Sequence, residues 1–351
     1  DSAGVETLNL KLYANGENHA VDLAGVTPTA GSVGSVIVTG GATGALTISN
    51  MNASQTTLDA SASNSAITLA AASRTDSAMT ITGSLVNDSI AMENVSDAID
   101  ASSGTGDTLV VSYTGIIGGI VVDLSADDQV TNMDGASNAA VQANFENVNV
   151  TAYTNFGASV TGTAKANTIT GTPLNDTITG GNGADTIIGN GGDDIVRLAE
   201  TISAADTVTL AVASSDTATI SGFTMNTDII DGDASAATGN GTPANTILQA
   251  AALTNGDGAA EISTNALVVF AVDDTSTAAV LAALNASDFD TTATTSRWFL
   301  YDTGAQLVLA KGTSANTNDN NDVTLVEFAT FTDITDIIST TLTVAGSIDF
   351  V

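Results

Sequence analysis

Oxygen-bearing side chains recur every nine residues between residues 162 and 197. The sixth residue of each nine-residue unit is, in turn, Asn167, Asp176, Asp185 and Asp194. Every unit begins with a glycine, and these are Gly162, Gly171, Gly180 and Gly189. Calcium is held by six to eight oxygen ligands at about 2.3–2.6 Å. The spacing therefore predicts calcium coordination by these side chains, together with turn residues that supply backbone carbonyls, namely Gly180, Asn182, Gly189 and Gly191.

A short strand is expected to follow each of these turns. The eighth residue of every unit is β-branched and apolar, namely Ile169, Ile178, Ile187 and Val196. Glycine permits the positive φ values of a tight six-residue turn. The remaining three residues form the strand, and the side chain of the eighth residue of the unit points inward. Alternate units fall on the same side of such a roll, which predicts that Asn167 pairs with Asp185 and Asp176 with Asp194. The alternative is a loop-rich linker of Gly, Asn and Asp.

The third unit, Gly180–Ile188, fits the pattern Gly-Gly-x-Gly-x-Asp-x-apolar-x closely. On this motif the chain resembles the RTX family of bacterial proteins exported by type I secretion. The resemblance implies a calcium-bound parallel β-roll that folds outside the cell. In the first two units Thr163-Ala164-Lys165 and Thr172-Pro173-Leu174 replace the glycines. The predicted order of metal ligands is therefore Asp176 with Asp194, then Asp185, then Asn167.

Partial copies of the unit occur outside this block. Gly83–Ala91 repeats its pattern with Asp88 in the acidic position, and Gly104–Leu109 contains Asp107. The acidic turn Asp228–Asp233 offers Asp231 and Asp233, either for one more calcium ion or as a solvated turn. Asp88, Asp107, Asp231 and Asp233 are second-rank ligand candidates.

Composition excludes several classes of partner. Lys and Arg number 6 against 39 acidic residues, which gives a formal charge of −33 and repels nucleic acid and anionic membranes. The absence of Cys suits a chain held together by metal ions instead of disulfides. No apolar run approaches the roughly 18 residues of a membrane span, and no basic signal peptide opens the chain. Because the chain begins at Asp1, we expect a processed product or part of a longer protein.

The predicted fold class is all-β, a parallel β-roll or β-solenoid. Residues 1–152 read as a Thr/Ser/Ala/Gly-rich β region, 153–240 as the calcium-binding roll, and 241–351 as a β-rich region. Helical spacing predicts short helices at Ser276–Asn285 and Ala136–Asn144, and a hairpin is expected around Asp302-Thr303-Gly304. The ending Ser347–Val351 is similar to type I secretion signals.

Catalytic motifs are missing or incomplete. His19 is the only histidine, so a His-Glu-x-x-His zinc site cannot form, and no Gly-x-Ser-x-Gly elbow occurs. Asp302-Thr303-Gly304 matches the aspartic-protease tripeptide but has no second copy to share a proton with. We therefore expect that the chain is not an enzyme.

A second resemblance concerns the phrase Val5–Leu10 followed by Thr-rich strands, which looks like crystalline surface-layer proteins of Gram-negative bacteria. It implies a secreted structural protein of the cell surface that assembles with copies of itself on binding calcium, with surface polysaccharide or lipopolysaccharide as a candidate anchor. The alternative is an RTX adhesin that recognises a glycan or surface. A third class, an exoenzyme, would need catalytic residues upstream of Asp1.

Overall fold

A computed structural model describes the protein in two compact units, Asp1–Ile178 and Thr179–Val351. The described residues are 7–13, 17–23, 34–41, 44–51, 55–70, 78–112, 118–133, 136–137, 140–198, 200–202, 204–210, 216–224, 227–232, 247–250, 267–270, 276–285, 295–314, 323–333 and 348–350. The three predicted regions, 1–152, 153–240 and 241–351, stay a prediction.

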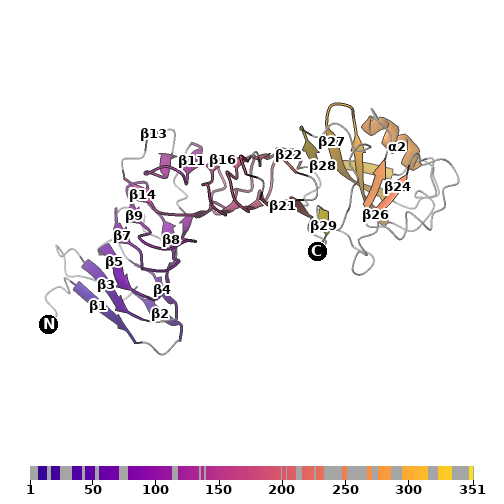
Figure 1. Cartoon of the computed structure of the whole chain (residues 1–351). Helices are drawn as coiled ribbons and strands as arrows, with labels where there is room; N and C mark the ends of the chain where they lie inside the picture. Colours follow the sequence, from indigo (N-terminus) through magenta and orange to yellow (C-terminus); the bar gives the residue numbers. More distant parts are fainter. Residues whose placement is uncertain are drawn as a thin grey trace. The chain divides into compact units, whose positions relative to one another are not determined.

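The first unit winds its chain alternately through two parallel sheets. One sheet has the order β1 (Thr7–Leu12), β3 (Gly34–Gly40), β5 (Gln55–Ser63), β7 (Thr80–Thr82), β9 (Ala98–Asp100) and β14 (Gln142–Ala143). The other has the order β2 (His19–Asp22), β4 (Leu46–Ser49), β6 (Ile67–Leu69), β8 (Ser89–Met92), β10 (Thr108–Val111), β15 (Asn147–Asn149) and β17 (Thr168–Thr170). Figure 1 shows β1, β3, β5, β7 and β9 stacked along one side and β2, β4 and β8 along the other. This is the parallel coil predicted from the sequence.

Aliphatic columns form the core of these coils. In the second sheet the parallel register aligns Leu69, Ile90, Leu109, Val148 and Ile169, each at most 4% exposed. Their neighbours along each strand are mostly Ser, Thr and Asn, which face outward because side chains alternate across a strand. The sequence supplies few aromatic residues, so a narrow aliphatic interior is what the coil can fill.

The short helix predicted at Ala136–Asn144 is wrong. The described residues there form β13 (Ala136–Ser137) and β14, and β13 pairs with β12 (Val130–Met133), which pairs with β11 (Ile120–Asp123). β11 also pairs in parallel with β16 (Ala158–Thr161). Two hydrogen bonds of Gln142 to other coils explain the extended backbone. Gln142 Nε2 donates to the Asp97 carbonyl at 2.5 Å, and the Gln142 carbonyl accepts the Gln129 N–H at 2.7 Å. Pairing with neighbouring coils outweighs the local helical pattern.

The second unit begins with parallel coils and then changes architecture; the division between the units falls within the residues of β18 (Thr177–Thr179). β19 (Thr186–Ile188), β21 (Thr207–Leu210), β23 (Ile229–Gly232) and β29 (Ile348–Phe350) pair in parallel in that order. β20 (Ile195–Arg197) pairs in parallel with β22 (Ala218–Ser221). Inside these coils Ile187, Val208 and Ile230 form an aliphatic column.

A mixed sheet with a helix completes the second unit. β28 (Val323–Phe331) pairs in parallel with β22 and antiparallel with β27 (Leu307–Ser314). β27 also pairs antiparallel with β26 (Thr295–Asp302), which confirms the predicted hairpin. β25 (Leu267–Phe270) and β24 (Ile247–Ala250) follow in parallel. The predicted helix is α2 (Thr277–Asn285), capped by Ser276 and packed through Val280 and Leu284. No helix of the described residues has the length and hydropathy to cross a membrane.

Candidate metal centre

The sixth-position side chains all lie in the interior of the coils. Asn167 is 3% exposed, Asp176 2%, Asp185 1% and Asp194 6%. Each precedes a three-residue strand whose central apolar side chain is also buried, so one turn delivers both groups to the inside. Burying a carboxylate is costly unless hydrogen bonds or a cation compensate it.

Asp176 is compensated by its own turn and by the neighbouring coil. Its Oδ2 accepts the Thr172 N–H at 2.7 Å, and its Oδ1 accepts the Ala158 N–H at 2.6 Å and the Thr172 hydroxyl at 2.8 Å. Burial, partly offset by these hydrogen bonds, raises the pKa of Asp176 to about 6. Thr172 also accepts the Leu174 N–H on its hydroxyl at 3.1 Å, which closes the turn without a glycine.

Asn167 sits in a turn of the same kind. Its Oδ1 accepts the Thr163 N–H at 2.7 Å, and its Nδ2 donates to the Glu146 carbonyl at 2.5 Å. The Thr163 hydroxyl accepts the Lys165 N–H at 3.0 Å. We call these two turns, Thr163–Asn167 and Thr172–Asp176, the threonine turns.

The third and fourth repeats form turns of another kind, which we call the glycine turns, Gly180–Asp185 and Gly189–Asp194. Positive φ occurs at their second and fourth positions, at Gly181 (105°), Gly183 (103°), Asn190 (72°) and Gly192 (96°). No side-chain hydroxyl lies within either turn. The oxygens of these turns are backbone carbonyls, the amide oxygens of Asn182 and Asn190, and the carboxylates of Asp185, Asp193 and Asp194.

The first glycine of each glycine turn is explained by close approach to the acid. A Cβ on Gly180 would lie 2.5 Å from Asp185 Oδ2, and a Cβ on Gly189 would lie 2.1 Å from Asp194 Oδ2. Neither glycine is among those with positive φ. The repeated Gly and Asp, five residues apart, are therefore one packing unit.

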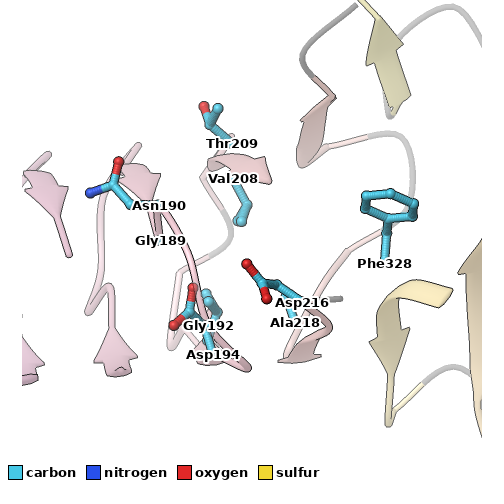
Figure 2. Close-up of a pocket in the computed structure, with 10 residues that line it drawn as sticks. Gly189, Asn190, Gly192, Asp194, Val208, Thr209, Asp216, Ala218 and Phe328 are labelled. Carbon is cyan, nitrogen blue, oxygen red and sulfur yellow. The ribbon is translucent and has the colours of Figure 1, made fainter. Parts of the chain in front are cut away.

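A small cavity lies beside the last glycine turn (Figure 2). Its volume is about 10 Å³, close to the space that one water molecule needs. It is lined by Gly189, Asn190, Gly192, Asp194, Val196, Val208, Thr209, Asp216, Ala218 and Phe328. Figure 2 shows the Asp216 carboxylate directed towards the side of the cavity that Asp194 and Val208 line. The carboxylates of Asp194 and Asp216 and the amide of Asn190 thus lie beside a space of this size, together with apolar side chains such as Val208 and Phe328.

This donor set fits calcium better than a transition metal. All the polar groups offered are oxygens or an amide, the ligands that calcium prefers. Among the described residues no three His, Cys, Asp or Glu side chains lie close enough to hold a metal by themselves. Backbone carbonyls and water must therefore supply most of the six to eight oxygens that calcium takes.

Acidic residues outside the four repeats occupy the equivalent place, directly before a short strand. In the first unit the Asp88 N–H donates to Asp107 Oδ1 at 2.6 Å, and the Asp107 N–H donates to Glu146 Oε2 at 3.0 Å. In the second unit the Asp185 N–H donates to Asp206 Oδ1 at 2.8 Å, and the Asp206 N–H to Asp228 Oδ1 at 3.1 Å. We call Asp88, Asp107 and Glu146 the N-terminal acid ladder, and Asp185, Asp206 and Asp228 the C-terminal acid ladder.

The C-terminal acid ladder is electrostatically strained. Burial, together with the charges of Asp228, Glu200 and Asp185, raises the pKa of Asp206 to about 7. Burial also raises the pKa of Asp228. Like charges in a poorly solvated site disfavour ionisation, so this interior favours protons or cations.

Sequence reasoning missed Asp206, Asp216 and Glu146 as members of these sites. An acidic residue two positions before a buried apolar residue is the shared signal, as in Asp206-Thr207-Val208. The ladder spacings of 19, 39, 21 and 22 residues hid this signal, because coils outside the repeats differ in length.

The other predicted ligands are placed as follows. Asp88 is 3% exposed and accepts the Ile67 N–H at 2.6 Å and the Ser84 hydroxyl at 2.7 Å, both on Oδ1. Asn182 Oδ1 accepts the Thr201 N–H at 2.9 Å. Asp231 lies in β23 opposite Thr209, and Asp233 lies outside the described residues. The pairs Asn167/Asp185 and Asp176/Asp194 stay predictions.

The Asp302-Thr303-Gly304 tripeptide forms an ordinary turn. Asp302 is 2% exposed, its Oδ1 accepts the Gly304 N–H at 2.6 Å, and the Thr303 N–H donates to the Gln306 carbonyl at 3.0 Å. These bonds close the β26–β27 hairpin.

Comparison with known families identifies the repeats. Residues 161–197 match the profile of the RTX calcium-binding nonapeptide repeat, in four copies. RTX nonapeptide repeats bind Ca²⁺, and proteins that contain them are typically secreted. The match supports an RTX protein and covers about a tenth of the chain. No curated protein matches the chain.

Proposed function

We propose that this chain is a secreted structural protein of a bacterial cell surface that folds and self-assembles when extracellular calcium binds. The observation that carries the proposal is the burial of acidic side chains at the turns of successive coils, in a chain with 39 acidic and 6 basic residues. Basic side chains are too few to neutralise them, so cations from the medium are the natural counter-charge.

Calcium and folding are linked in this proposal. Where calcium is scarce, as inside a cell, the acidic turns repel one another and the chain stays unfolded and exportable. Outside, calcium near millimolar suffices for extracellular-type sites with dissociation constants of about 10⁻⁴–10⁻³ M. Binding free energy then contributes directly to folding free energy.

The glycine turns are the proposed primary sites. Asp194 and Asp185 would contribute carboxylate oxygens, and Gly180, Asn182, Gly189 and Gly191 would contribute backbone carbonyls. Asp176 and Asn167 rank after them, because the threonine turns already satisfy their side chains with hydrogen bonds. Asp88, Asp231 and Asp233 remain secondary candidates.

Assembly is tested on the pure chain. Adding millimolar calcium should produce ordered sheets or filaments in negative-stain microscopy and a rise in light scattering, and chelation should reverse both. A calcium-loaded chain that stays monomeric and binds a glycan array would overturn the assembly proposal in favour of an adhesin.

A further inference from the structure

Three acidic residues far apart in the sequence meet in the first unit, outside the RTX repeats. Parallel pairing sets Thr108 opposite both Ser89 and Asn147, so the preceding residues Asp88, Asp107 and Glu146 lie in consecutive coils. Their backbone-to-carboxylate hydrogen bonds of 2.6 and 3.0 Å run from coil to coil. Asp107 is the middle member of this N-terminal acid ladder.

Asp107 has one carboxylate oxygen that the protein leaves unsatisfied. The residue is 0% exposed, and its Oδ2 is buried and accepts no hydrogen bond. In Asp88 the corresponding oxygen accepts the N–H of Ser84, four residues earlier, at 2.5 Å. Four residues before Asp107 stands Ser103, whose N–H donates instead to the Ser84 carbonyl at 3.4 Å. A buried unsatisfied carboxylate oxygen is costly.

A glycine also lies close to the Asp107 carboxylate, as one does to the acid of each glycine turn in the RTX block. A Cβ on Gly104, three residues before the acid, would lie 2.3 Å from Asp107 Oδ2, and a Cβ on Gly180, five residues before Asp185, would lie 2.5 Å from Asp185 Oδ2. In the Asp88 turn, by contrast, the Ser84 hydroxyl donates to the carboxylate at 2.7 Å. Ser103 stands at the corresponding position before Asp107, but no hydrogen bond satisfies Asp107 Oδ2, so this carboxylate lacks the compensation that Asp88 receives.

The surroundings of Asp107 are negative. Burial first, and then the charges of Asp88 and Glu146, raise the pKa of Asp107 to about 7. The Asp107 side chain thus combines an unsatisfied oxygen with two neighbouring acids, the arrangement that a bound cation would stabilise.

We propose that Asp107 Oδ2 is a direct ligand of a calcium ion bound outside the RTX repeats. Asp88 and Glu146 supply negative charge beside it, and backbone carbonyls and water complete the oxygen shell, since three carboxylates alone do not form a closed cluster here. The inference is independent of self-assembly. It extends calcium binding to the coils that precede residue 161.

The variant Asp107→Asn tests the site, because it keeps the shape of the side chain and removes its charge. Bound calcium is counted by native mass spectrometry and by equilibrium dialysis at millimolar calcium. We expect one calcium fewer per chain than in the wild type. In chelator the variant should melt at a higher temperature than the wild type, because a buried uncompensated charge is gone. Addition of calcium should then raise the melting temperature of the variant less than that of the wild type.

Matched variants make the outcome decisive. Asp127→Asn removes an exposed carboxylate and should change neither quantity. Glu146→Gln, at a half-buried position, should weaken the same calcium ion and serves if Asp107→Asn does not fold. Two outcomes would overturn the proposal, because each would mean that Asp107 holds a proton and not a metal ion. The first is an unchanged calcium count in both Asp107→Asn and Glu146→Gln. The second is a melting temperature of Asp107→Asn that is raised equally with and without calcium. The calcium count tests this site, and microscopy of the assembled protein tests the proposed function. A variant that loses the ion but still assembles supports the site without bearing on assembly, and a chain that keeps the ion but does not assemble contradicts only the proposed function.

Discussion

Glycine and aspartate act as a pair at the residue scale. Gly83, Gly180 and Gly189 each lie five residues before a buried acid, and a Cβ on any of them would approach that acid's Oδ2 to 2.1–2.5 Å. The motif therefore depends on packing at its first position and on positive φ at its second and fourth positions. The sequence analysis explained the repeat glycines by backbone conformation and by carbonyl ligands, and did not predict this packing against the acid.

The variant Gly189→Ala tests this pairing. The added methyl group would displace Asp194 from its turn, so we expect a loss of about 1–3 kcal/mol of folding free energy and weaker calcium binding. Urea unfolding in the presence of calcium measures the first effect. Gly119→Ala is the control, since a Cβ there would meet its nearest atom only at 3.5 Å. Equal stability of both variants would contradict the steric explanation.

Exchange of the acids themselves tests the repeat sites. Asn167 already occupies the sixth position of the first repeat, so Asp176→Asn with Asp194→Asn should leave the fold possible. We expect the double variant to lose at least one bound calcium and to show a smaller calcium-induced rise in melting temperature. Calorimetric titration gives the count, and Asp127→Asn serves as the unchanged reference. An unaltered stoichiometry would defeat the ligand assignment.

The raised carboxyl pKa values predict a pH dependence in the absence of metal. The pKa of Asp206, about 7 in the folded chain, exceeds the usual aspartate value of about 3.9. Its protonated form therefore favours folding below the unfolded pKa, and this contribution is lost as pH rises through about 7. In chelator the melting temperature should fall between pH 5 and pH 8, less steeply in Asp206→Asn. A melting temperature that rises over this range would contradict the prediction.

Aliphatic columns hold consecutive coils together at the element scale. Parallel register places Ile187 against Val208 and Val208 against Ile230, all at most 1% exposed. Because each strand has only three or four residues, one inward side chain carries most of its burial. Asp185, Asp206 and Asp228 directly precede these strands, and the carboxylates of Asp206 and Asp228 accept backbone N–H groups of the neighbouring coils.

Truncation of one column member should therefore be expensive. Ile187→Ala is expected to lower folding free energy by about 2–5 kcal/mol, because it leaves a cavity between two coils. Ile202→Ala removes the same atoms from a side chain that is 76% exposed and should stay near neutral. Chemical denaturation with calcium present compares them. Similar losses in both would contradict the assigned column.

Charge dominates at the scale of the whole molecule. A net charge of −33 over 351 residues opposes compaction, and the described interior adds buried acids to that repulsion. Metal binding would offset both effects at once.

Removal of calcium should therefore unfold the coils. Circular dichroism should show a reversible loss of β signal on chelation and its recovery with calcium. Magnesium should restore it poorly, because it demands octahedral geometry and gives up its water reluctantly. A circular dichroism spectrum that does not change on adding chelator would contradict the proposal that calcium binding after export drives folding.

The sequence by itself determined the all-β coil and the inward positions of the repeat residues. A nine-residue period fixes one turn and one short strand, so Asp176 and Ile178 must both face the interior. The helix at Ser276–Asn285 and the hairpin beside it were also predictable, since capping and turn residues act locally. Local signals failed at Ala136–Asn144, where pairing between coils prevailed.

Only the tertiary structure decided which acids are satisfied and which are not. Asp88, Asp107 and Glu146 are separated by 19 and 39 residues, and the register between coils alone brings them together. Whether a carboxylate meets a hydroxyl, as Asp176 does, or keeps an unsatisfied oxygen, as Asp107 does, depends on the turn that each coil places beside it. Hydrogen bonds between coils are set by pairing across variable loop lengths, which no local sequence pattern encodes.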